Sequence, residues 1–103
     1  MDEATLRPVA EAHAQAVCDP IDEAHLQSDF IEELHPQLPA IAQTLPQPVR
    51  SATVDSVVVA ADGHATVLIT YTGDESQVTI NSRWEDRGGE QPQVVSAEPT
   101  EPQ

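Results

Sequence analysis

Residues 65–84, ATVLITYTGDESQVTINSRW, decide the fold of this chain. Apolar and polar residues alternate along 65–72 and again along 78–84, as they do in strands that bury one face. The residues between these two runs, Gly73 to Ser76, are typical of a turn. The stretch therefore predicts an antiparallel hairpin whose buried face carries Tyr71 and Trp84.

A further strand is predicted before this hairpin. Residues 53–60 are rich in valine and other β-branched side chains, which favour strands. Their apolar residues change face between Val54 and Val57, which indicates either a β-bulge or burial on both faces. Asp62–Gly63 is a typical hairpin turn and joins this strand to residues 65–72.

A fourth strand is predicted after the hairpin. Residues 86–90, DRGGE, predict another turn, and residues 93–97, QVVSA, are long enough for a short final strand. We expect Val95 to lie on the buried face of that strand. Residues 98–103, EPTEPQ, predict a disordered acidic tail.

The residues before the sheet show helical patterns. Arg7–Pro8 suits the start of a first helix, since proline is tolerated in the first turn. Val9, His13 and Val17 then share one face of that helix. The chain's only cysteine, Cys18, follows and is expected to be a small buried apolar residue, because a neighbouring carboxylate disfavours a reactive thiolate.

A second helix is predicted from Asp19–Pro20, with Asp19 as its cap and Pro20 at its first position. Leu26, Phe30 and Leu34 recur at every fourth position and form its apolar face. Pro36 is expected to stop it. Residues 38–45 predict a short third helix that opens at Pro39.

These patterns predict an α+β fold in which two or three N-terminal helices pack on a four-stranded antiparallel meander sheet. One domain is expected over residues 1–97, with a helical half at 1–48 and a sheet half at 49–97, as the length of 103 residues suggests. The expected core consists of Leu26, Phe30, Leu34, Ile41, Leu45, Val57, Val59, Val67, Ile69, Tyr71, Val78, Ile80, Trp84 and Val95.

Charge excludes several classes of partner. Four arginines and no lysine face 18 acidic residues, so the net charge is −14 at neutral pH. Nucleic acid and anionic membrane surfaces are therefore not expected as partners, because the long-range interaction is repulsive. No apolar run is long enough to insert into a membrane. The N-terminus lacks a signal-peptide pattern, and the location stays open: extracytoplasmic if a leader has been trimmed away, otherwise cytoplasmic.

Sequence motifs for catalysis or metal binding are not apparent. His13, His25, His35 and His64 lack the spacing of a metal motif and are expected at the surface or at helix ends. Adjacent carboxylate pairs do not face each other on a helix or strand. No nucleophile elbow or phosphate-binding loop occurs. We therefore predict a protein that is not an enzyme, with no catalytic, cofactor-binding or metal-binding residues.

One polar residue is unusual. Ser82 lies between Ile80 and Trp84 on the face expected to be buried, and Tyr71 lies on the neighbouring strand. The three residues Tyr71, Ser82 and Trp84 therefore predict a small pocket between the sheet and the helices.

The sheet half also resembles a known class of domain. Residues 52–97, and within them Asp62–Gly63, Tyr71, Trp84 and Gly88–Gly89, resemble cystatin-like, nuclear-transport-factor-like domains. The small versions in actinobacterial lipoproteins and mammalian-cell-entry-associated proteins are most similar. The resemblance implies helices first and strands after, and a non-enzymatic domain. The second tryptophan of the family's last hairpin is absent, and no residue matches the Asp/His pair of its enzymatic members.

Three functions are consistent with the sequence. The first is a non-catalytic accessory or protein-interaction domain, which binds a protein partner or forms a homodimer through the open sheet face at Leu68, Thr70, Thr79 and Asn81. The second is a small-ligand-binding protein or degenerate enzyme that uses the predicted pocket. The third is an acidic inhibitor or immunity-type protein that binds a basic partner.

Overall fold

The computed structural model describes residues 2–18, 21–46, 48–86 and 92–100. Three α-helices and a 3₁₀ helix precede four strands. Their bounds are α1 Glu3–Val17, α2 Glu23–Asp29, η1 Glu32–Gln37, α3 Leu38–Ala42, β1 Ser51–Val59, β2 His64–Thr72, β3 Gln77–Glu85 and β4 Gln93–Pro99. The predicted α+β fold, with N-terminal helices on a four-stranded antiparallel meander, is confirmed.

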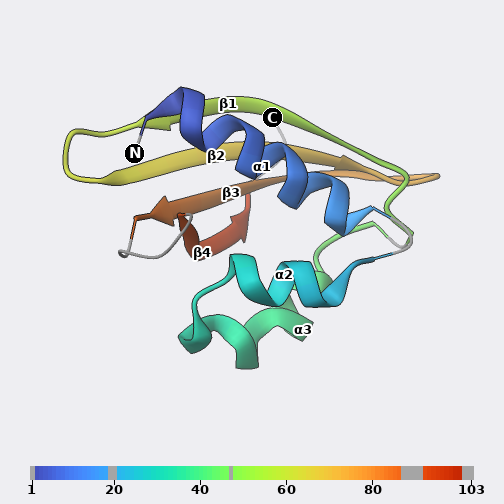
Figure 1. The fold of residues 1–103 in the computed structure, drawn as a ribbon. Helices are drawn as coiled ribbons and strands as arrows, with labels where there is room; N and C mark the ends of the chain where they lie inside the picture. Colours follow the sequence, from blue (N-terminus) through green and yellow to red (C-terminus); the bar gives the residue numbers. More distant parts are fainter. Residues whose placement is uncertain (1, 19–20, 47, 87–91, 101–103) are drawn as a thin grey trace.

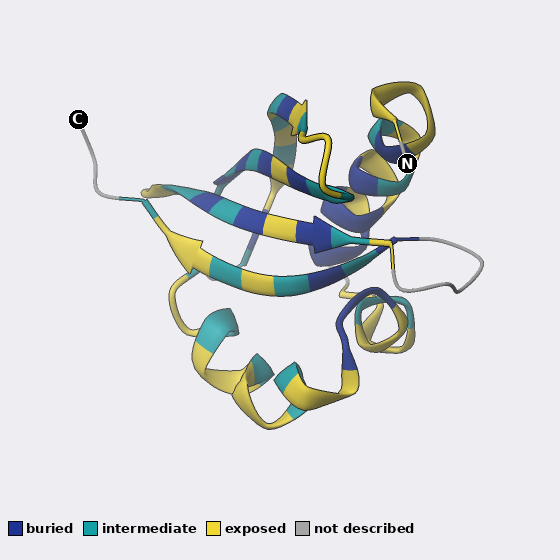
Figure 2. Ribbon diagram, turned by 90° about the vertical axis from the view of Figure 1, so that its left-hand side faces the viewer, coloured by how far each residue is buried: buried dark blue, intermediate teal, exposed yellow. Residues whose placement is uncertain are grey.

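The four strands pair in the order β1-β2-β3-β4, each antiparallel to the next. In Figure 1, α1 crosses in front of β1 and β2, whereas α2 and α3 lie together below β3 and β4. Buried and exposed residues alternate along the strands in Figure 2. The register of β1 and β2 shifts between Val54 and Ser56, at the point where the apolar residues of β1 change face, as a β-bulge would produce.

Helix α1 starts earlier than predicted. The Asp2 side chain accepts a hydrogen bond of 2.8 Å from the backbone N–H of Thr5, which makes Asp2 the N-cap. Pro8 therefore lies inside the helix and not at its start. The prediction was wrong because it gave weight to the proline and overlooked the capping aspartate.

The ends of helix α2 also differ from the predicted ones. Its N-cap is Asp22, whose side chain accepts from the backbone N–H of His25 at 3.1 Å. The predicted start at Asp19–Pro20 lies outside the described residues. The helix ends at Asp29, and Phe30 is extended, with φ −94° and ψ 145°.

The early end of α2 has a tertiary cause. Phe30 forms an isolated parallel bridge with Val94 of β4, and the N–H of Ile31 donates to the Val94 carbonyl at 3.1 Å. This contact satisfies part of the exposed edge of β4. Beyond it, the chain turns through η1 into α3, so the helical face predicted for Phe30 and Leu34 is not continuous.

The core lies between α1 and the inner face of the sheet. It includes Leu6, Ala10 and Ala14 of α1, which the prediction omitted. Val94 is fully buried and Val95 only partly, so the predicted face of β4 was wrong. The register of β3 and β4 shifts between Arg83 and Trp84. The predicted core residues that the structure leaves only partly buried are Leu26, Leu34, Ile41, Leu45, Val59 and Val78.

Strand β4 extends into the segment that the sequence predicted as a tail. Strand β4 continues through Glu98 to Pro99, and the N–H of Thr100 donates to the Thr79 carbonyl at 2.8 Å. Residues 98–100 therefore belong to the sheet region and not to a tail. Residues 101–103, and the predicted turn at 87–90, lie outside the described residues.

Candidate functional site: an apolar pocket with a buried histidine

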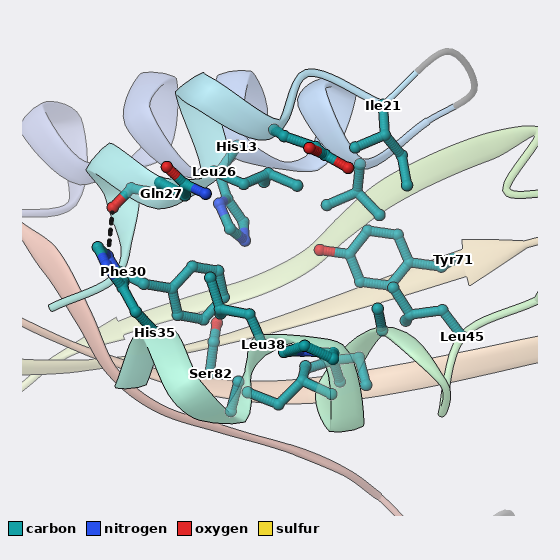
Figure 3. Close-up of a pocket in the computed structure, with 17 residues that line it drawn as sticks. His13, Ile21, Leu26, Gln27, Phe30, His35, Leu38, Leu45, Tyr71 and Ser82 are labelled. Atoms are coloured by element: carbon teal, nitrogen blue, oxygen red, sulfur yellow. Dashed lines mark hydrogen bonds between the residues drawn. The ribbon is translucent and has the colours of Figure 1, made fainter. Parts of the chain in front are cut away.

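A pocket of about 430 Å³ lies between the inner face of the sheet and the helices. Its lining residues come from α1, α2, η1, α3 and strands β2, β3 and β4, as Figure 3 shows. They are His13, Val17, Ile21, Glu23, Leu26, Gln27, Phe30, His35, Leu38, Pro39, Ile41, Ala42, Leu45, Tyr71, Ile80, Ser82 and Ala97.

The helical wall of the pocket is apolar but incompletely buried. Leu26, Leu38, Ile41 and Leu45 line the pocket and are each only partly buried. Neither η1 nor α3 contains a fully buried residue. The side chains on this wall therefore face open space where core side chains elsewhere in the molecule meet close-packed neighbours.

One hydrogen bond connects two elements of the helical wall. His35 Nε2 donates to the backbone carbonyl of Gln27 at 2.9 Å, which ties η1 to α2 across the pocket margin (Figure 3). Both residues line the pocket. The bond thus fixes where the wall formed by α2 meets the wall formed by η1 and α3.

One polar residue of the pocket lining, His13, forms a buried pair with Asp29. His13 Nδ1 lies 2.9 Å from Asp29 Oδ2, and the side chains are 5% and 0% exposed. His25 Nε2, one helical turn before Asp29, lies 3.2 Å from the same oxygen. A buried carboxylate needs such donors, because an uncompensated charge in the interior is costly. Asp29 at the end of α2 is thereby tied to α1.

The ring of His13 is held by two aromatic neighbours. Its centroid lies 5.5 Å from that of Phe30 and 5.4 Å from that of Trp84, with both pairs in edge-to-face geometry. With Nδ1 bonded to Asp29, the other ring nitrogen, Nε2, points into the pocket in Figure 3. Within the described part of the chain, no hydrogen-bond partner of His13 Nε2 occurs.

Tyr71 contributes a second polar atom. It is 3% exposed, and its hydroxyl points into the pocket toward the His13 ring (Figure 3). No described residue forms a hydrogen bond with this hydroxyl. Burial raises the pKa of Tyr71, and Cys18 and Asp29 in their ionised forms act in the same direction. The phenol is therefore held in its neutral form.

Ser82 has a different role from Tyr71. Its hydroxyl donates to the Val67 carbonyl at 3.0 Å and accepts from Trp84 Nε1 at 3.0 Å. Both bonds are buried, and together they satisfy the indole N–H inside the core. Of the three residues in the predicted pocket, Tyr71 and Ser82 line it, whereas Trp84 lies behind His13 and outside the lining.

Sequence reasoning missed the pair of His13 and Asp29. The two residues are 16 positions apart on different helices, so no spacing motif connects them. His13 was expected at the surface or a helix end but is 4% exposed. Its position on the apolar face of α1, with Val9 and Val17, was the one available signal of burial.

Three further observations concern the cysteine, metal binding and the membrane. Cys18 is a free thiol whose Sγ lies 3.6 Å from the Ala14 carbonyl, and burial raises its pKa. Among the described residues, no group of three or more His, Cys, Asp or Glu side chains has the arrangement of a metal site. None of the described helices combines the length and hydropathy needed to cross a membrane.

Comparison of the chain with protein-family models, curated proteins and solved structures finds no match.

Proposed function

We propose that this protein binds a small, largely apolar ligand in the pocket between the sheet and α2, η1 and α3. The observation that carries the proposal is the pairing of an apolar wall with two inward-facing polar atoms, His13 Nε2 and the Tyr71 hydroxyl, that no described residue satisfies. Ligand sites characteristically combine a concave apolar surface with a few placed polar groups. The volume of about 430 Å³ lies in the range of such sites.

The energetics favour occupancy. Complete burial of a leucine-sized side chain is worth about 1.5–3 kcal/mol relative to full exposure. Leu38, Ile41 and Leu45 obtain only part of this in the free protein, since each is half-buried against the pocket. A ligand would cover these surfaces without a rearrangement of the sheet.

The test uses the single tryptophan of the chain. Trp84 contacts His13, which lines the pocket, so occupancy should change its fluorescence. Small cycloalkanes and their oxygenated derivatives would be titrated, with calorimetry as an independent measurement. We expect saturable binding to the wild-type protein.

A matched pair of variants locates the binding site. Ala97→Phe on β4 would fill the pocket and abolish binding, because Ala97 lines it. Ser96→Phe adds the same ring at the neighbouring exposed position and should leave binding unchanged. Equal affinity of both variants for the ligand would refute this site.

The interaction-domain function remains a prediction. It is supported by the outer sheet face, where Leu68, Thr70, Thr79 and Asn81 are only partly buried and Val58 is 62% exposed. A strictly monomeric protein in sedimentation, with no loss of partner capture on Leu68→Glu, would count against it.

The acidic-inhibitor function also remains a prediction, supported by the net charge of −14. A salt-insensitive complex would argue against it.

Membership of the cystatin-like, nuclear-transport-factor-like class is also a proposal. The order of helices followed by an antiparallel meander supports it. The absence of enzymatic activity likewise remains a prediction, to be tested with the ligands that bind.

A further inference from the structure

His13 Nε2 and the Tyr71 hydroxyl, two pocket atoms without a hydrogen-bond partner among the described residues, differ in what they offer a ligand. We propose that the ligand is an uncharged alcohol: a compact apolar body with one hydroxyl group that binds between His13 Nε2 and the Tyr71 hydroxyl. This inference rests on the proposed ligand-binding function and adds the chemical class of the ligand.

His13 offers an acceptor. A carboxylate accepts hydrogen bonds and cannot donate them, so the contact of 2.9 Å with Asp29 places the ring proton on Nδ1. The second ring nitrogen of an uncharged imidazole then presents a lone pair. In the uncharged ring, Nε2 can therefore accept a hydrogen bond from a ligand that carries a donor, and it points into the pocket in Figure 3.

Tyr71 offers a donor. Its phenol is neutral, because burial disfavours the phenolate. Its O–H can therefore donate into the pocket, on the side that faces His13 (Figure 3). A ligand hydroxyl accepts from Tyr71 with its oxygen and donates its own proton to His13 Nε2. One group thus satisfies both protein atoms.

Other oxygenated groups satisfy them less well. A ketone accepts from Tyr71 but leaves His13 Nε2 without a donor. A carboxylate would enter an apolar cavity near the buried Asp29, in a chain of net charge −14, and would lose its hydration there. The structure thus ranks the three groups as alcohol, ketone and carboxylate in order of decreasing affinity.

Size limits the ligand. At about 30 Å³ for each water-sized group, a pocket of about 430 Å³ holds a body of roughly ten to fourteen non-hydrogen atoms. The cage hydrocarbon adamantane with one substituent falls in this range. Its derivatives permit comparison of functional groups on one rigid skeleton.

The experiment measures dissociation constants of 2-adamantanol, 2-adamantanone, adamantane-1-carboxylate and adamantane by calorimetry at neutral pH. We expect the alcohol to bind roughly tenfold more tightly than the ketone. One buried hydrogen bond changes a dissociation constant by about this factor. The carboxylate should bind more weakly still. A ketone or carboxylate that binds as tightly as the alcohol would overturn the proposal.

Two further measurements assign the contacts. Tyr71→Phe removes only the hydroxyl and should weaken alcohol binding roughly tenfold while adamantane binding stays the same. In the wild-type protein, the ¹⁵N resonance of His13 Nε2 should move with the alcohol and not with adamantane. An unchanged Nε2 resonance, or unchanged affinity in Tyr71→Phe, would refute the assigned contact. Failure of all four probes to bind would overturn the ligand-binding function itself.

Discussion

His13 Nδ1 lies 2.9 Å from Asp29 Oδ2, and this bond between two almost fully buried side chains joins α1 to the end of α2. It holds the imidazole against Phe30 and Trp84 and directs the other ring nitrogen into the pocket. Stability and the candidate site therefore depend on the same contact. The histidine contributes to packing through its ring and to the pocket through one atom.

The first prediction concerns this pair. Asp29→Ala should lower the free energy of unfolding by about 2–4 kcal/mol, because it removes a buried charged partner and leaves His13 Nδ1 without an acceptor. Urea unfolding followed by Trp84 fluorescence measures the loss. The double variant Asp29→Ala/His13→Leu should cost less than the sum of the single changes, with His13→Leu alone as the reference. Additive costs would show that the two side chains are not coupled.

The second prediction concerns Ser82. Ser82→Ala should cost about 1–3 kcal/mol, because the Trp84 indole N–H would lose its acceptor inside the core. Ser56→Ala serves as the matched control, since Ser56 is a partly exposed strand serine. Urea unfolding of both variants provides the comparison. Equal, small effects would contradict a structural role for the Ser82 hydroxyl.

The third prediction concerns two glycines. A Cβ on Gly73 would lie 2.5 Å from Pro46 Cβ and 3.1 Å from the Pro48 carbonyl oxygen, so Gly73→Ala should cost about 1–3 kcal/mol through overpacking. Gly63 has open space but a φ of +87°, so Gly63→Ala should cost roughly 1 kcal/mol through backbone strain.

A second substitution separates these two causes. Pro46→Gly removes the atom that Gly73→Ala would strike, so it should recover part of the loss in Gly73→Ala and none of the loss in Gly63→Ala. Thermal unfolding of the single and double variants tests this. No difference between the two glycine backgrounds would contradict the steric explanation.

The fourth prediction concerns alkaline pH. The folded-state pKa of Tyr71 is raised above the ordinary value of 10.0, so the folded protein favours the neutral phenol. The associated stability is complete below pH 10 and is lost progressively as the pH rises above it. Because Tyr71 is the only tyrosine, phenolate absorbance reports this group alone. Ionisation should coincide with unfolding, and Tyr71→Phe should resist alkaline unfolding better. Ionisation near pH 10 in a protein that stays folded would contradict this expectation.

Local patterns were sufficient to predict the sheet. Alternation along 65–72 and 78–84, with turn residues between them, corresponds to the observed pairing of Ala65 with Trp84 and Tyr71 with Val78. The change of face in β1 was predictable because a bulge inserts one residue and reverses the alternation. These features depend on neighbours in sequence or on one hairpin.

The pocket was only partly predictable. Ser82 and Tyr71 were identified because a polar residue and an aromatic one interrupt a buried face, and both do line the pocket. His13 and Asp29 could not be paired from the sequence, because the packing of α1 against α2 brings them together. Their chemistry belongs to the interface between two helices and to neither helix alone.

The sequence by itself determined the class of fold, since the period of its apolar residues requires strands after residue 50 and helices before it. Tertiary structure decided where the helices end and what the pocket contains. Phe30 leaves its helical pattern because its backbone pairs with Val94 at the open edge of β4. A contact between residues 64 positions apart thus outweighs local propensity, because it satisfies backbone groups that the sheet edge would otherwise expose.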